Sequence, residues 1–139
     1  MTQEDKDLLL KDLCARLPYG VKYMDLWNPD EQPTILCDIN VDVELIMNTD
    51  GFSLEIEKCR PYLFPLSSMA EEQQEEFDKI YADDMQVVVN NLKNRLDGQP
   101  YETNFGHFRH IDWLNKNHFD YRGLIPIGLA IDATNLNVY

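Results

Sequence analysis

The histidines of the sequence offer the first candidate for metal chemistry. His107 and His110 are three residues apart, so on a helix they share one face, with Asp112 nearby as a conceivable further ligand. His118 is eleven residues after His107, about 16 Å along a straight helix, and cannot join the pair. The HExxH pattern of zinc proteases is absent. The sequence favours an ordinary surface or half-buried histidine pair, and whether His107 and His110 bind a metal stays open.

A run of acids in the middle of the chain could in principle perform acid/base or metal chemistry, because carboxylates four residues apart share a helix face. The run comprises Glu71, Glu72, Glu75, Glu76 and Asp78. No histidine accompanies it, and two of its members fall in the first turn of a predicted helix, where the helix dipole favours negative charge. A solvated acidic face is therefore the favoured interpretation.

Nucleophilic and nucleotide chemistry have no recognisable pattern in this sequence. None of the serines lies in a G-x-S-x-G turn, and no GxGxxG or GK[ST] loop is present. The periodicity points Cys14, Cys37 and Cys59 inward, which predicts reduced, mostly buried thiols that form no disulfide. We therefore predict no catalytic residue, no metal and no cofactor.

Residues 105–123 combine aromatic rings with basic side chains, a composition that is typical of binding surfaces. The side chains that we expect to contact a partner are Trp113, Lys116, His118, Asp120, Tyr121 and Arg122. The favoured alternative is that the large rings belong to the core and close the fold. A helix end is predicted at Asn117 and His118. After it, side chains should alternate, so that Phe119 and Tyr121 are buried. Asp120 and Arg122 should then face out, free to bind a partner or to bridge to each other or to a neighbouring loop.

The first half of the chain predicts a helix followed by an antiparallel meander. Thr2 and Asp5 are typical of a helix start, and Pro18 with Gly20 marks its end. A strand is expected at 20–26, and residues 48–51 predict a hairpin turn. The helical side chains expected to face inward are Leu9, Leu10, Leu13, Cys14 and Leu17. Those expected to face inward from the strands are Ile35, Cys37, Ile39, Val43, Leu45, Met47, Phe52, Leu54 and Ile56.

The second half predicts mostly helices. Residues 60–65 contain two prolines and should run extended along a sheet edge or over the core. Ser68 and Glu71 resemble a capping box that starts one long or two consecutive helices, with residues 83–84 as the weak point. A last helix is expected at 107–117, before an irregular tail or short strand. The side chains expected to pack this helix are Phe108, Ile111 and Leu114.

These elements predict an α+β fold in a single acidic domain, residues 1–139. It should comprise an N-terminal helix, a small antiparallel sheet of three to four strands, and C-terminal helices packed on one face. The net charge of −13 argues against direct contact with nucleic acid or anionic lipid, and no apolar run is long enough to cross a membrane. The first residues lack the order of a signal peptide, so we expect a cytoplasmic protein.

Three segments of the sequence resemble a known family: LLLKDLCARLPYGVK (8–22), KCRPYLFPLSSM (58–69) and DWLNKNHFDYRGLIPIGLAIDA (112–133). The family consists of small uncharacterised proteins of gut anaerobic bacteria, often encoded near prophage or other mobile elements. The resemblance implies neither an activity nor a catalytic residue. The hairpins at 35–56 and the helix at 84–97 lie outside it.

The function that the sequence favours is that of a non-enzymatic accessory protein that contacts another protein. One alternative is an acidic mimic of nucleic acid, in which carboxylates imitate phosphates and occupy a DNA-binding protein. A second alternative is an enzyme of unfamiliar type, in which His107, His110 or a cysteine meets a carboxylate in a pocket. The sequence predicts neither the identity of the partner nor the oligomeric state.

Overall fold

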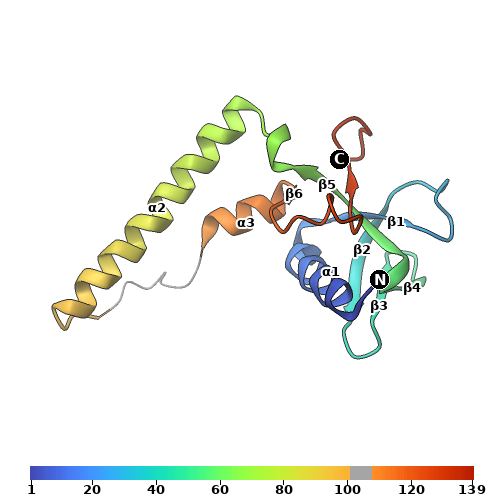
Figure 1. The fold of residues 1–139 in the computed structure, drawn as a ribbon, viewed down its shortest axis with the longest axis horizontal. Helices are drawn as coiled ribbons and strands as arrows, with labels where there is room; N and C mark the ends of the chain where they lie inside the picture. The colour runs from blue at the N-terminus through green and yellow to red at the C-terminus, as the bar shows by residue number, and fades with distance from the viewer. Residues whose placement is uncertain (101–107) are drawn as a thin grey trace. The chain divides into compact units, whose positions relative to one another are not determined.

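The computed structural model describes residues 1–100 and 108–139 (Figure 1). The chain forms two compact units: unit 1 comprises Met1–Ser68 with Asn115–Tyr139, and unit 2 comprises Met69–Leu114. Helices and strands are both present, which confirms the predicted α+β class. The single folding domain over 1–139 stays a prediction. None of the helices in the described ranges is both long enough and apolar enough to span a membrane.

Unit 1 begins with helix α1, Gln3–Arg16, whose predicted start is confirmed. The Thr2 hydroxyl accepts the Asp5 N–H at 3.1 Å, and the Asp5 carboxylate accepts the Thr2 N–H at 3.0 Å. Hydrogen bonding of the Asp5 carboxylate by the backbone and side chain of Thr2 lowers the pKa of Asp5. The chain continues into a 3-10 turn, η1 (Leu17–Tyr19), and leaves it at Gly20, which has a φ of 67°. Glycine adopts this left-handed conformation without strain.

The inward face of α1 differs from the predicted one. Leu9 and Leu13 are buried as expected, but Cys14 is exposed and Leu10 only half-buried. The remaining buried positions belong to two charged residues, Asp12 and Arg16, which form an i, i+4 ion pair. Apolar spacing alone could not reveal this, because an ion pair is buried only when the rest of the fold supplies its partners.

The sheet of unit 1 has seven strands, more than the three to four predicted, in the order β4-β3-β2-β1-β5-β6, with β7 also beside β5. Strands β1 to β5 pair antiparallel, whereas β6 and β7 run parallel to β5. The strands are β1 (Lys22–Asp25), β2 (Thr34–Asn40), β3 (Leu45–Asn48), β4 (Ser53–Glu55), β5 (Cys59–Pro65), β6 (Phe119–Asp120) and β7 (Ile131–Asp132).

Strand β5 lies inside the sheet, so the prediction that residues 60–65 follow an edge or cross the core is wrong. It pairs with β1 on one side, where Pro61 stands opposite Tyr23, and with the two short parallel strands on the other. The prolines suggested an edge because proline cannot donate to a strand ladder. The two short strands, each of two residues, gave too weak a sequence pattern to reveal that this edge is covered.

At the start of β2, the face that points inward is opposite to the predicted one, whereas Ile39 packs against the core as predicted. Leu36 is 2% exposed, while its neighbours Ile35 and Cys37 are exposed. On β3, Ile46 is buried and Met47 exposed. The register between the two strands shifts after Leu36, and a shift of one residue turns a strand over. Among the other side chains predicted to face inward, Ile56 is buried, Leu45, Leu54 and Ile39 are half-buried, and Val43 and Phe52 are exposed.

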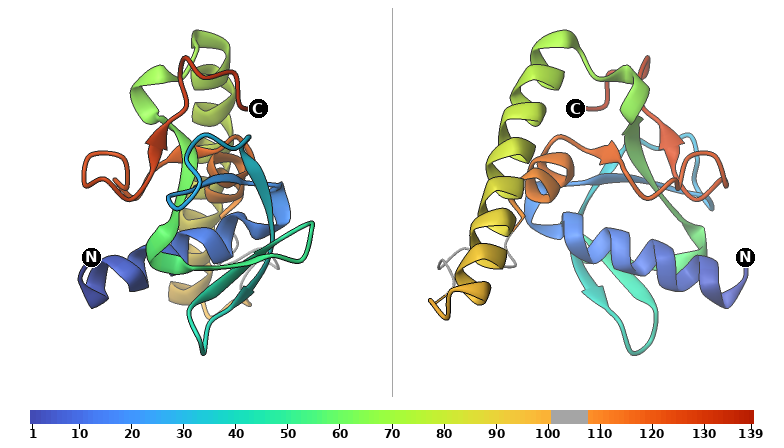
Figure 2. Two further views of the ribbon diagram at one scale, coloured as in Figure 1. Left: turned by 90° about the vertical axis from the view of Figure 1, so that its right-hand side faces the viewer. Right: turned by 60° about the vertical axis from the view of Figure 1, so that its left-hand side comes forward.

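The core of unit 1 is formed where α1 lies against the sheet (Figure 2). Side chains from the helix, the loop after it, and the strands meet there and exclude water. The apolar side chains among them that are almost completely buried include Leu9, Leu13, Val21, Leu36, Ile46, Ile56, Leu63 and Leu124. The same strands hold in place the loops described below.

Unit 2 contains the long helix α2, Glu71–Leu96, without a break at residues 83–84. The side chain of Gln73 accepts the Ala70 N–H at 2.9 Å, whereas the Ser68 hydroxyl donates to the Pro65 carbonyl. The predicted capping box of Ser68 and Glu71 is therefore wrong. A 3-10 turn, η3 (Leu66–Ser68), precedes the helix, and a second, η2 (Ile56–Lys58), precedes β5.

Helix α3, Arg109–Lys116, is shorter than the predicted 107–117, and its last two residues belong to unit 1. Of the side chains predicted to pack it, Leu114 is buried, Ile111 half-buried and Phe108 exposed. Trp113, which was not among them, is buried. The packing of the C-terminal helices on one face of the sheet stays a prediction.

Candidate functional site

A groove of about 360 Å³ opens in unit 1 between the segment after β1 and the β3–β4 hairpin. We call it the aromatic groove. The first wall is formed by Tyr23, Asp25, Trp27, Asn28, Glu31 and Thr34. The second wall is formed by Asn48, Phe52, Ser53 and Leu54. Its size lies within the range of ligand-binding clefts in proteins.

Asp25 fixes the loop that carries the first wall. Its carboxylate accepts the Trp27 backbone N–H at 2.7 Å and the Asn28 side-chain amide at 3.1 Å. The Leu26 N–H donates to the Lys58 carbonyl at 2.9 Å. The backbone of Trp27 is thus held from two directions, while its side chain is 66% exposed. The Lys58 ammonium lies 4.7 Å from the centroid of the indole, within the range of a cation–π contact.

Asn48 plays the same part in the second wall. Its side-chain oxygen accepts the N–H groups of Asp50 and Phe52, at 2.9 and 3.0 Å, across the predicted hairpin turn, where Gly51 has a φ of 82°. The turn is confirmed, and its asparagine closes it. The Phe52 ring is 72% exposed. Trp27 and Phe52 therefore combine a backbone that is held by hydrogen bonds with an exposed aromatic side chain.

Tyr23 forms the buried part of the groove. Burial raises the pKa of Tyr23 to about 12; the nearby Cys59 and Asp25 also raise it, whereas a hydrogen bond with Asn48 lowers it. The phenol consequently keeps its proton across the physiological range. It is a neutral hydrogen-bonding group at the base of two exposed rings.

The charge of the groove is negative. It is lined by the carboxylates of Asp25 and Glu31, and no lysine, arginine or histidine of the described ranges lines it. Asp25 is engaged by its own loop, whereas the Glu31 carboxylate makes no hydrogen bond or ion pair to another described residue. Glu31 is also exposed. The groove thus offers one available carboxylate beside two exposed rings.

A second cavity of unit 1, about 340 Å³, contrasts with the aromatic groove. Lys6 lies among its acids and pairs with Glu44 at 3.3 Å and with Glu57. The hydrogen bonds with Glu57 and Glu44 raise the pKa of Lys6. The hydrogen bond with Lys6 in turn lowers the pKa of Glu57. This cavity therefore contains a cation of its own, which pairs with two of its three acids.

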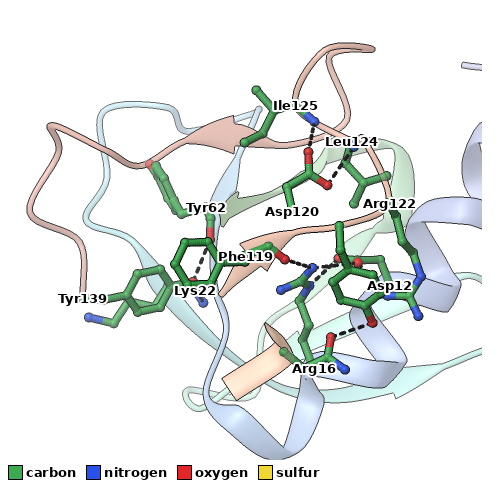
Figure 3. A network of polar contacts seen from close by, with 12 residues as sticks. Asp12, Arg16, Lys22, Tyr62, Phe119, Asp120, Arg122, Leu124, Ile125 and Tyr139 are labelled. Atoms are coloured by element: carbon green, nitrogen blue, oxygen red, sulfur yellow. Dashed lines mark hydrogen bonds and ion pairs between the residues drawn. The ribbon is translucent and has the colours of Figure 1, made fainter. Parts of the chain in front are cut away.

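The segment that the sequence predicted as a binding surface contributes to a buried network in unit 1 (Figure 3). Arg16 donates to the two carboxylate oxygens of Asp12 at 2.7 and 3.1 Å, and to the Phe119 carbonyl at 2.7 Å. Arg122 donates to Asp12 at 2.9 Å. Asp12 and Arg16 are fully buried, so Arg122 bridges to the interior and does not face freely into solvent.

Asp120 is 7% exposed, so the prediction that it faces out is wrong. Its carboxylate accepts the backbone N–H groups of Leu124 and Ile125, at 2.9 and 2.8 Å, and thereby closes the turn after β6. Phe119 is buried as predicted. Tyr121 is half-buried and donates its hydroxyl to the Asn115 side chain at 2.9 Å.

His118 packs against the end of the chain. It has a φ of 62°, so His118 itself, rather than Asn117, takes the left-handed conformation after α3. Its ring stacks on Tyr139 with centroids 3.7 Å apart. Burial, together with the positive charges of Arg16 and Lys22, lowers the pKa of His118 to about 4. The Tyr139 hydroxyl donates to the Tyr62 carbonyl and accepts the Lys22 N–H.

Among the remaining residues of the predicted binding surface, Trp113 is 8% exposed and Lys116 is exposed. Most members of this surface thus contact their own chain. Partner binding through the segment stays a prediction, with Lys116 as its most accessible member. The sequence composition could not distinguish a binding surface from packing within the fold, because aromatic rings and arginines stabilise the periphery of a core as well as an interface.

Of the predicted histidine pair, His107 lies outside the described residues. The Asp84 carboxylate accepts the backbone N–H of His110 at 2.8 Å and contacts its Nδ1 at 2.6 Å. His110 and Arg109 lower the pKa of Asp84 against the opposing effect of burial. This acid therefore caps the start of α3. Residues 1–100 and 108–139 contain no group of side chains suited to a metal ion.

The three cysteines are free thiols, but only Cys59 is buried. The prediction of mostly buried thiols is therefore wrong, since Cys14 and Cys37 are exposed. Burial raises the pKa of Cys59 strongly, which keeps that thiol protonated and unreactive. The five acids of the run at the start of α2 are exposed, as predicted.

No protein-family model, curated protein or solved structure matches this chain. Its function is therefore argued from its own residues. The sequence analysis missed the aromatic groove and treated Phe52 as core. The available signal was that Trp27 and Phe52 each adjoin a polar turn, where few neighbours exist to cover a large ring.

Proposed function

We propose that the protein acts as a non-enzymatic accessory protein and that it binds a segment of another protein in the aromatic groove. The observation that supports this most directly is the exposure of Trp27 and Phe52, 66% and 72%, on the walls of one cavity. Covering a large apolar side chain contributes on the order of 1.5–3 kcal/mol. Aromatic residues of this kind commonly dominate the energy of protein interfaces.

The support of the two loops favours binding further. The carboxylate of Asp25 and the amide of Asn48 hold the backbone at Trp27 and Phe52 before any partner arrives. A partner then orders only side chains, and binding loses less conformational entropy. With a volume of about 360 Å³, the groove suits one or two side chains of an extended segment.

The acidic mimic of nucleic acid remains the alternative proposal. The exposed acids at the start of α2, Glu71 to Asp78, supply negative charge on one helix. That proposal predicts competition with DNA for a DNA-binding protein and does not require the aromatic groove. An enzyme of unfamiliar type stays a third alternative, for which the contact of Asp84 with His110 supplies a carboxylate and an imidazole but no nucleophile.

The proposal can be tested by selecting from a random twelve-residue peptide library on the immobilised full-length chain. We expect the wild-type protein to enrich a related set of peptides and the double variant Trp27→Ala, Phe52→Ala to enrich none. The matched control is Ile127→Ala, Leu136→Ala, which removes two other exposed apolar side chains of unit 1. The same peptides selected by the double variant, or none selected by the wild type, would contradict the proposal.

A further inference from the structure

We infer that the aromatic groove recognises a basic side chain, lysine or arginine, in the partner segment. This inference rests on the proposed function and adds the chemistry of the ligand to it. It follows from three features of the groove: its uncompensated negative charge, the arrangement of its rings, and the cation that already contacts one of them.

The negative charge of the groove lacks a counterpart among the lining residues. Asp25 and Glu31 line it without any described basic side chain, although the oxygens of Asp25 are engaged by the loop that they hold. Glu31 is exposed, and its carboxylate makes no hydrogen bond or ion pair to another described residue. Asp25 therefore contributes negative electrostatic potential, and the carboxylate of Glu31 is the hydrogen-bond acceptor that a cationic ligand would contact.

The rings complete a site for a cation with an apolar stem. Lysine and arginine carry three or four methylene-like carbons that pack on apolar surface while the charged group contacts a carboxylate. Trp27 and Phe52 both line the groove, and indole is the ring that attracts cations most strongly. A neutral apolar ligand would cover the rings but leave the carboxylates without a partner. An acidic ligand would be repelled.

Lys58 indicates that the indole accepts an ammonium group. Its Nζ lies 4.7 Å from the centroid of the Trp27 ring, although it is not among the residues that line the groove. A ligand ammonium or guanidinium that approaches the same ring must displace Lys58 or bind beside it against charge repulsion. Removing the Lys58 charge should therefore strengthen the binding of a basic ligand, whereas it should weaken the binding of an acidic ligand.

The charge of the whole chain acts in the same direction. With 25 acidic and 12 basic residues, the protein attracts cationic segments over distances comparable with the Debye length, about 8 Å at physiological salt. This long-range attraction raises the rate of encounter and is not specific to one site. Specificity must come from the geometry at Glu31 and Trp27, which single substitutions can separate from net charge.

The experiment measures fluorescence anisotropy with the peptide that the wild-type chain enriches most. We expect that peptide to contain lysine or arginine, and replacing arginine by uncharged citrulline, or lysine by norleucine, to raise Kd by about tenfold or more. Glu31→Gln should raise Kd about three- to tenfold, whereas Asp42→Asn, which removes another exposed acid of unit 1, should change it less than twofold. Lys58→Met should lower Kd.

Two results would overturn the inference and leave the proposed function intact. One is enrichment, dependent on Trp27 and Phe52, of peptides that contain no basic residue. The other is a Kd that changes equally with Glu31→Gln and Asp42→Asn, since general charge would then explain the binding. Failure to enrich any peptide would instead contradict the proposed function itself, and the inference with it.

Discussion

Unit 1 contains two regions rich in aromatic side chains, and they differ in what those side chains contact. In the C-terminal tail, residues 118–139, His118 stacks on Tyr139, and the hydroxyl of Tyr139 makes hydrogen bonds with the backbone of Tyr62 and Lys22. In the aromatic groove, the hydrogen bonds stop at the backbone and the rings of Trp27 and Phe52 lie in water. The tail uses its rings to complete the fold, whereas the groove keeps its rings available.

The charges of the two regions differ in the same way. Where the tail meets α1, the carboxylate of Asp12 contacts two guanidinium groups, that of Arg16 on the same helix and that of Arg122 in the tail. In the groove, Asp25 and Glu31 meet no basic side chain among the lining residues of the described chain. Substitutions in the tail should therefore change stability, and substitutions in the groove should change binding.

The largest change is expected for Asp12→Ala. Among the described residues, it leaves the fully buried guanidinium of Arg16 with the Phe119 carbonyl as its one remaining hydrogen-bond acceptor. Removing one partner of a buried ion pair costs about 3–5 kcal/mol, because the other charge stays buried and unpaired. Urea denaturation monitored by circular dichroism measures the loss in the free energy of unfolding. Lys11→Ala, an exposed residue of the same helix, is the control and should change it by less than about 0.5 kcal/mol.

A smaller change is expected for Asp120→Ala. The substitution leaves two backbone donors, the N–H groups of Leu124 and Ile125, without their acceptor, and Leu124 is buried. Such a group costs about 1–3 kcal/mol. Asp132 makes a similar contact to the Thr134 N–H on the exposed surface, so Asp132→Ala should cost about 0.5–1 kcal/mol in the same assay. Equal losses for the two variants would show that burial of Asp120 does not matter.

The sequence predicted the locally determined parts of this fold. The start of α1, the hairpin turn at 48–51 and the α+β class each depend on residues close together in the chain, and the structure confirms them. It failed where distant residues decide. The inward face of β2 depends on a register shift against β3, and the interior place of β5 depends on two-residue strands from the other end of the chain.

The candidate site was missed for the same physical reason. Aromatic residues beside basic ones at 105–123 looked like a binding surface, but the buried acid that engages two arginines lies about a hundred residues earlier, at Asp12. Phe52 looked like core because it alternates with Leu54 and Ile56, yet just before the edge strand β4 it is 72% exposed. The spacing of residues predicts which side chains share a face of a helix or strand, but not whether other parts of the fold cover that face.

A pH-dependent change of intermediate size is expected from His118. Burial and the positive charges of Arg16 and Lys22 lower the pKa of His118 to about 4, against an unfolded value of 6.5. Between these values the unfolded chain binds a proton that the folded chain does not, so stability falls as pH falls through this window. From pH 7.5 to 5.5 the loss attributable to His118 should be about 1 kcal/mol after allowance for solvent screening.

Thermal unfolding of the wild type and His118→Asn at the two pH values measures this effect. Asparagine suits the left-handed conformation at this position, and it does not titrate. The variant should lose the His118 part of the pH dependence, whatever its stability at pH 7.5. An identical fall in Tm between pH 7.5 and 5.5 in both proteins would mean that other groups, such as carboxylates, account for it.

The smallest change in stability is expected for the groove. Trp27→Ala together with Phe52→Ala removes two exposed rings and the contact of Lys58 with the indole, while Asp25 and Asn48 still hold both loops through the backbone. Exposed substitutions of this kind usually change stability by less than about 1 kcal/mol. The double variant should therefore unfold near the wild-type urea midpoint and yet bind no selected peptide.

Tyr139→Ala is the counterpart in the tail: it removes the stack on His118 and the hydroxyl contacts, so it should lower the midpoint and leave peptide binding unchanged. If the groove variant loses as much stability as the tail variant, the rings at Trp27 and Phe52 complete the fold just as those of the tail do, and the division between the two regions does not hold.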